Sequence, residues 1–147
     1  MAKPIYVING PNLNRLGLRE PEIYGTTTLA DVEKMCRAAA GGHPVEFRQS
    51  NSEAQIIDWV HEAIEQGGGI IINPAAFTFV SIAILDSLKM FPGPIIELHI
   101  TNIHKREPIY HNSLVSKVAT GVMAGFGAEG YPLAMRAILA MVAAKAK

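Results

Sequence analysis

The first part of the chain gathers side chains that could act on a small anionic molecule. The stretch from Asn9 to Gly25 carries asparagine amides, the guanidiniums of Arg15 and Arg19, and the phenol of Tyr24. Asparagine both donates and accepts hydrogen bonds, arginine only donates them, and tyrosine can act as a base when its pKa is lowered. This combination suits a lid over a small, oxygen-rich anion better than a plain connection between elements.

Tyr24 is the candidate base in this stretch. Its pKa must come from about 10 towards neutrality, and each pKa unit corresponds to ~1.4 kcal/mol. A nearby cation lowers a tyrosine pKa, and Arg19 lies in the same segment. The plain alternative is that Tyr24 only packs at the end of a loop.

A candidate acid lies further along the chain. Glu97 and His99 alternate on one face of a predicted strand, where they could form a hydrogen-bonded histidine–carboxylate pair. With His104 they also suggest metal ligands, but neither their spacing nor a further ligand supports a zinc site, and we expect no metal. A base, an acid and the neutral amides of Asn12 and Asn73 are the parts needed for elimination through an enolate.

Strand-like apolar runs alternate with helical patterns along the whole chain, which predicts a parallel sheet covered on both faces. We expect one domain over residues 1–147, an α/β flavodoxin-like three-layer fold with a five-stranded parallel sheet. The predicted strands are Ile5–Ile8, Val45–Gln49, Gly69–Ile72, Ile95–Ile100 and Val118–Ala124. The predicted helices are Leu29–Ala40, Glu53–Gln66, Thr78–Lys89 and Ala128–Ala144.

In such a sheet the ligand site lies beyond the carboxyl ends of the strands. The polar residues expected there are those from Asn9 to Tyr24, then Asn73, then those from His99 to Arg106. We therefore expect these three segments to converge.

Composition narrows the function classes. The chain has 13 basic and 13 acidic residues and no basic stripe, so we expect no nucleic acid partner. The first apolar run is too short for a signal peptide, and no run reaches transmembrane length. The single cysteine, Cys36, lies among apolar residues at helical spacing, so we expect a packed thiol in a cytoplasmic protein.

Two glycine-rich segments resemble nucleotide-binding loops without meeting their requirements. Gly125–Gly130 matches the dinucleotide pattern G-x-G-x-x-G, but no further strand with an acidic residue follows. Gly67–Gly69 lacks the lysine and hydroxyl residue of a phosphate loop. We expect no cofactor.

Seven segments together resemble the type II 3-dehydroquinate dehydratases over nearly the whole chain. They are Asn9–Gly17, Arg19–Pro21, Ile23–Gly25, Arg48–Glu53, Glu97–His104, Arg106–Glu107 and Ala119–Val122. The resemblance implies a flavodoxin-like fold, a dodecamer built from trimers, and no metal or cofactor. It also implies anti elimination of water from 3-dehydroquinate, a cyclic hydroxy keto acid, to give 3-dehydroshikimate in the shikimate pathway or in quinate catabolism.

The resemblance also implies roles for individual residues. Tyr24 removes a C2 proton while Arg19 depresses its pKa, and Asn12 orients a water against the enolate. His99 protonates the departing C1 hydroxyl, with Glu97 behind it. The backbone of Ile100 and Thr101 and the side chain of Asn73 bind the substrate. Asp86 reaches the site of a neighbouring subunit.

Two positions depart from the family pattern. The family's Asn-x-Gly-Ala-Tyr-Thr-His-Thr-Ser reads Asn73 to Ser81 here, so a substrate-binding histidine has become Phe79. The second arginine of the family's Arg-Glu-x-Phe-Arg is replaced by Tyr110. Three hypotheses follow: a working dehydratase, a paralogous lyase on a less hydroxylated cyclic keto acid, and a catalytically weak binding or scaffold protein.

Overall fold

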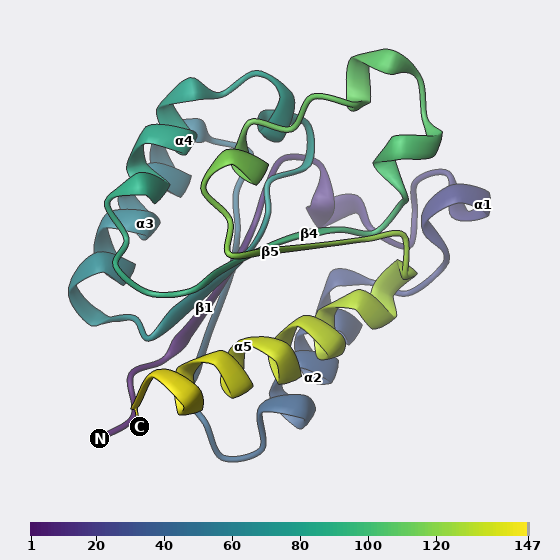
Figure 1. Cartoon of the computed structure of the whole chain (residues 1–147). Coiled ribbons are helices and arrows are strands. Elements are labelled where there is room, and N and C mark those ends of the chain that lie inside the picture. Colours follow the sequence, from purple (N-terminus) through teal and green to yellow (C-terminus); the bar gives the residue numbers. More distant parts are fainter. Residues whose placement is uncertain (147) are drawn as a thin grey trace.

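The computed structural model describes residues 1–146, apart from the side chains of Tyr24 and Ala146. A five-stranded parallel sheet with the strand order β2-β1-β3-β4-β5 forms its centre (Figure 1). The strands are β1 (Ile5–Asn9), β2 (Val45–Gln49), β3 (Gly69–Asn73), β4 (Ile95–His99) and β5 (Gly121–Ala124). This confirms the predicted flavodoxin-like sheet, in which the chain reverses its direction of sheet growth between β1 and β3.

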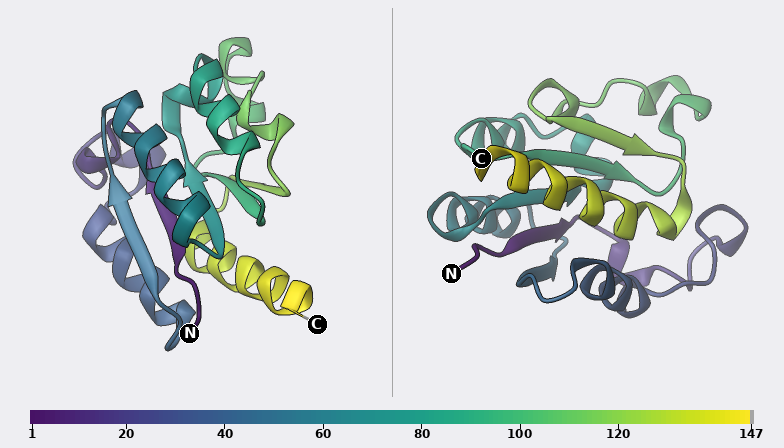
Figure 2. Two further views of the ribbon diagram at one scale, coloured as in Figure 1. Left: turned by 90° about the vertical axis from the view of Figure 1, so that its left-hand side faces the viewer. Right: turned by 60° about the horizontal axis from the view of Figure 1, so that its bottom comes forward.

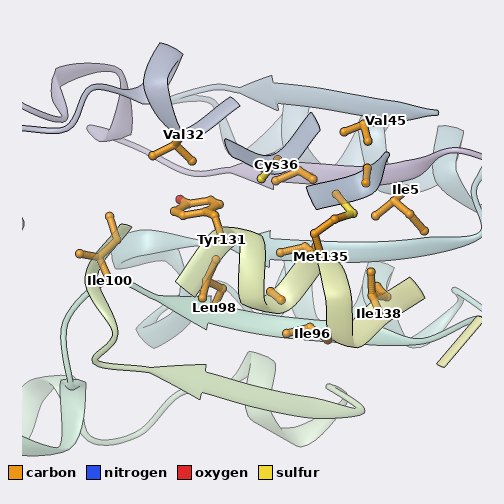
Figure 3. Close-up of a cluster of buried hydrophobic side chains, with 14 of the residues drawn as sticks. Ile5, Val32, Cys36, Val45, Ile96, Leu98, Ile100, Tyr131, Met135 and Ile138 are labelled. Atoms are coloured by element: carbon orange, nitrogen blue, oxygen red, sulfur yellow. The ribbon is translucent and has the colours of Figure 1, made fainter. Parts of the chain in front are cut away.

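Two helical layers cover the sheet, and the alternation of side chains along each strand explains why. In β1, Ile5 and Val7 belong to a core shared with α2 (Leu29–Ala40) and α5 (Gly130–Ala146) (Figure 3). Tyr6 and Ile8 point to the opposite face, into a core shared with α3 (Glu53–Gln66) and α4 (Ile82–Lys89). Because both faces are buried at the centre of the sheet, β1 and β3 are almost entirely apolar up to the asparagine that ends each of them.

Cys36 lies in the first of these cores and is fully buried (Figure 3). Burial raises the pKa of its thiol to about 12. The prediction of a packed thiol is confirmed. Within residues 1–146, no helix combines the length and apolar character needed to cross a membrane.

The predicted helix over Thr78–Lys89 is wrong at its beginning. A 3-10 helix spans Ala75–Phe79, and α4 begins only at Ile82. The reason is Ser81, whose side-chain oxygen accepts a hydrogen bond from the backbone N–H of Ile84 at 3.0 Å and so caps a new helix.

The predicted strand Val118–Ala124 is also too long, because β5 begins at Gly121. A 3-10 turn over Val115–Lys117 precedes it, and Val118 and Ala119 still donate to the carbonyl of Val115, each at 3.0 Å. The last helix likewise begins at Gly130, two residues later than predicted, because a 3-10 turn over Gly127–Glu129 precedes it. A short helix, α1 (Pro21–Tyr24), was not predicted from the sequence.

Candidate active site

A cavity of about 140 Å³ lies at the carboxyl edge of the sheet. In Figure 2 (right) the strand arrows point towards this edge, where the segment containing α1 and the segment after β4 lie beyond the sheet. The cavity is lined by Pro11, Asn12, Leu13, Leu16, Arg19, Asn73, Ala75, Ala76, Phe79, His99, Ile100, Thr101, Ile103, Arg106 and Tyr110. The three polar segments predicted to converge therefore do so.

The floor of the site is the switch point between β1 and β3, where Asn9 and Asn73 lie side by side in register. Tyr131 of α5 joins them: its hydroxyl donates to Asn9 Oδ1 at 2.7 Å and accepts from Asn73 Nδ2 at 2.9 Å. All three side chains are buried. Gly10 follows Asn9 at a point where a side chain has no room, since a Cβ would lie 2.4 Å from the carbonyl oxygen of Pro74.

Asn12 is held at the pocket by the loop after β2. Its φ of 71° places it in the left-handed region, which asparagine tolerates better than most residues. Its backbone N–H donates to Asn51 Oδ1 at 2.9 Å. Gln49 Nε2 donates to that same Asn51 oxygen and to the carbonyl of Gly10, both at 3.1 Å. Gln49 and Asn51 thus fix the backbone that presents Asn12.

Glu97 and His99 form the predicted pair at the end of β4. Nε2 of His99 contacts Glu97 Oε2, Glu97 is fully buried, and the His99 ring lines the cavity. Burial alone would raise the pKa of Glu97, but hydrogen bonds from His99, Ser116 and Ser113 outweigh it and hold that pKa below its ordinary value. Nδ1 of His99 makes no hydrogen bond to any described residue, so it is the ring nitrogen left for a ligand.

One wall of the cavity is aromatic at the two positions that depart from the family pattern. The ring of Phe79 stacks on that of His99, with centroids 6.5 Å apart. Tyr110 meets Phe79 edge-on at 5.3 Å and carries the Arg106 guanidinium 3.8 Å from its ring centroid. The four side chains form one continuous series of contacts, from His99 through Phe79 and Tyr110 to the Arg106 guanidinium.

The segment between β1 and α2 contributes Arg19, which lines the cavity and forms an ion pair with Glu20 at 3.4 Å. Tyr24 ends α1 in the same segment. Its side chain lies outside the described residues, so its predicted contact with Arg19 stays a prediction.

The substrate-contact residues predicted by resemblance divide into two groups. Ile100, Thr101 and Asn73 line the cavity together with Phe79 and Tyr110. Asp86 does not line it: it lies exposed on α4, with Lys89 Nζ at 3.8 Å from its carboxylate. Asp86 therefore contributes nothing to the lining of this chain's own pocket.

Several positioning residues escaped the sequence analysis. Asn9 ends β1 as Asn73 ends β3, and an asparagine at the end of an apolar strand is a signal that could have found it. Gln49 and Asn51 stand in a segment that resembles the family but carries no obvious chemistry. Tyr131, Ser113 and Ser116 give no local signal, since each contacts its partner only through the folded structure.

The fold and the pocket together define a small-molecule enzyme of the flavodoxin-like α/β class. The family model "Dehydroquinase class II" matches residues 3–139. The chain belongs to the class II dehydroquinase family.

Relatives and solved structures agree with this. A protein of Cereibacter sphaeroides named 3-dehydroquinate dehydratase is 57% identical over 145 residues, covering 97% of this chain and 99% of that protein. One of Agrobacterium fabrum, named 3-dehydroquinate dehydratase 2, is 58% identical over 135 residues, covering 90% and 92%. The crystal structure of type II dehydroquinase from Propionibacterium acnes matches with a TM-score of 0.88 and 47% identity, covering 92% of this chain and 94% of that one.

Proposed function

We propose that this chain removes water from 3-dehydroquinate to give 3-dehydroshikimate, using the residues that converge at the carboxyl edge of the sheet. The chain is a 3-dehydroquinate dehydratase by family; the proposal assigns the steps of the reaction to its residues. The observation that carries it is that His99, held by a buried carboxylate, opens onto the same cavity as Asn12 and Arg19.

The reaction begins with Tyr24. As a phenolate, Tyr24 removes a proton from C2, next to the C3 ketone, and an enolate forms. Arg19 favours the phenolate because a cation stabilises the charged form of a neighbouring acid. Asn12 orients a water whose hydrogen bond stabilises the enolate oxygen, and its fixed backbone supports this role.

His99 completes the elimination as the general acid. With Nε2 directed to Glu97, the proton delivered to the C1 hydroxyl comes from Nδ1. The C1–oxygen bond breaks, water leaves, and the electrons of the enolate form the C1–C2 double bond while the ketone is restored. Glu97 keeps the ring oriented and stabilises the imidazolium before transfer.

The substrate's polar groups are bound by the rest of the lining. The backbone N–H groups of Ile100 and Thr101 suit a carboxylate, and Asn73 offers the donor and acceptor capacity that Tyr131 and Ala75 leave unused. Phe79 and Tyr110 face the ring on an apolar wall. The comparisons favour the dehydratase over a paralogous lyase or a scaffold protein, because the relatives that match nearly the whole chain are named 3-dehydroquinate dehydratase.

The proposal includes assembly of the chain with copies of itself, into a cytoplasmic dodecamer built from trimers. Val80 lies just before α4 and Ile82 is its first residue; their side chains are 72% and 64% exposed, and adjoining exposed apolar surface is typical of an interface. Asp86 lies exposed on the same helix, where a neighbouring pocket can receive it. Light scattering at micromolar concentration tests this, and a monomer would contradict it.

The activity is tested by incubating purified protein with 3-dehydroquinate and recording the enone absorbance of the product. Steady formation of 3-dehydroshikimate without added metal or cofactor is expected. No product at any pH would contradict the proposal.

A further inference from the structure

Glu97 receives more hydrogen bonds than its pairing with His99 requires. Its Oε2 accepts from His99 and from the hydroxyl of Ser113 at 2.7 Å, and its Oε1 accepts from the hydroxyl of Ser116 at 2.5 Å. Both serines come from the segment between β4 and β5. A fully buried carboxylate is thus bound on both oxygens by neutral donors from outside its own strand.

The hydroxyl of Thr78 supports this arrangement from a third segment. Thr78 Oγ1 and Ser113 Oγ are 2.6 Å apart, and both side chains are buried. Ser113 has a single hydroxyl hydrogen and gives it to Glu97, so Thr78 must be the donor of this bond. The backbone N–H of Leu114 also donates to the carbonyl of Thr78 at 2.7 Å, which fixes the two segments to one another.

In the described part of the chain, His99 is the one charged partner in contact with the Glu97 carboxylate. The neighbours of Glu97 in register are Ile72 on β3 and Val122 on β5. When His99 gives up its proton, the buried anion loses its cationic partner, and only hydrogen-bond donors remain to stabilise it.

We propose that Ser113 and Ser116 are positioning residues that keep Glu97 ionised throughout the reaction, with Thr78 orienting Ser113. The inference rests on the proposed role of His99 as the acid. Without the serine donors, the carboxylate becomes a stronger base and takes up a proton at a higher pH. It then no longer holds His99 in the orientation that directs Nδ1 to the substrate.

The test compares Ser116→Ala and Ser113→Ala with two further variants. Ser116 is exposed, so removing its hydroxyl leaves the core intact, and Ser116→Thr keeps a hydroxyl at the same place. Ser87→Ala is the matched control, because this buried serine donates to the carbonyl of Ile84 at 2.8 Å and has no contact with Glu97. Two quantities are measured: the pH dependence of kcat with 3-dehydroquinate, and the titration of the Glu97 carboxyl carbon by NMR.

Each serine-to-alanine change should move the acidic limb of kcat and the Glu97 titration upward by about one pH unit, since a hydrogen bond to a charged group is worth at least that much. Ser116→Thr should restore both, and Ser87→Ala should leave both in place. A lower kcat with unmoved titration in Ser116→Ala, or no recovery in Ser116→Thr, would overturn the inference.

The two proposals fail separately. A wild-type protein without dehydratase activity would contradict the proposed function, while the carboxyl titration would still decide on the serines. If Ser113→Ala does not fold, Ser116→Ala decides in the same way.

Discussion

Tyr131 donates its hydroxyl hydrogen to Oδ1 of Asn9 at 2.7 Å, and this bond joins the last helix to the end of the first strand. The same hydroxyl accepts from Asn73 at 2.9 Å. Burial raises the pKa of Tyr131, so the phenol is neutral and remains a donor. A residue on α5 therefore helps to orient both asparagines at the switch point, together with the carbonyl of Arg48 for Asn9 and the backbone N–H of Ala75 for Asn73.

Replacing Tyr131 by phenylalanine should lower the free energy of unfolding by ~1–3 kcal/mol, because the buried atoms Asn9 Oδ1 and Asn73 Nδ2 lose their hydrogen bond to the phenol. Denaturant unfolding measures this. Tyr6→Phe is the control: it also removes a phenol hydrogen bond, of 2.6 Å to Glu62, but that carboxylate is half-buried and water can replace the donor. An equal loss in both variants would contradict a special role for Tyr131.

The change Tyr24→Phe should leave unfolding unaltered and reduce kcat by ~10²-fold or more, the usual contribution of a general base. Phenylalanine keeps the ring and removes only the group that accepts the C2 proton. Initial rates of enone formation and a denaturation curve measure the two effects. Retention of more than about a tenth of the activity would show that Tyr24 is not the base.

The change His99→Ala should slow the loss of water more than the exchange of the C2 proton. The enolate can still form without the acid, whereas the C1 hydroxyl leaves poorly unless it is protonated. Proton NMR in deuterated buffer follows C2 exchange while absorbance follows product. If the rates of C2 exchange and of water loss fall equally, His99 is not a separate general acid.

The double change Phe79→His with Tyr110→Arg tests the aromatic wall. If the substrate hydroxyls lack hydrogen-bond partners because Phe79 and Tyr110 replace donors, the double change should lower KM for 3-dehydroquinate by about 10²-fold. A regained hydrogen bond contributes ~1 kcal/mol from a neutral donor and ~1.5–3 kcal/mol from a charged one. The double change also ends the stacking of Arg106 on Tyr110.

Phe79→Leu with Tyr110→Leu is the control for that experiment, because it removes the rings without adding donors. A wild-type KM already in the low micromolar range, unimproved by the double change, would show that both replacements are harmless. The wall would then be a tolerated variation within the family.

Glu97 should make the free energy of unfolding depend on pH in the acidic range. Its folded pKa lies below the ordinary value of 4.5, so the ionised carboxylate stabilises the fold fully above that value and loses this effect as pH falls through the folded pKa. The stability difference between wild type and Glu97→Gln should therefore shrink as pH is lowered below about 4.5. Denaturant unfolding at several pH values measures it, with the exposed Glu22→Gln as control. A difference that grows in acid would contradict the assignment.

The sequence by itself determined the layers and most of the chemical groups. Apolar runs such as Ile5–Ile8 and the helical pattern of Leu29–Ala40 depend on local periodicity, which is visible without a structure. The pairing of Glu97 with His99 was also predictable, since two residues apart on a strand share a face. The sequence motifs around Tyr24 and Arg19 were sufficient to indicate the family to which the chain belongs.

Only the tertiary structure decided how these groups are held. Tyr131 contacts Asn9 across 122 positions of chain, and Ser116 reaches Glu97 across 19. The break between the 3-10 helix Ala75–Phe79 and α4 depends on Ser81, which both caps the helix and donates to Glu53 at 2.5 Å. Such hydrogen bonds join groups that no local pattern relates, because their geometry exists only once the sheet and both helical layers have packed.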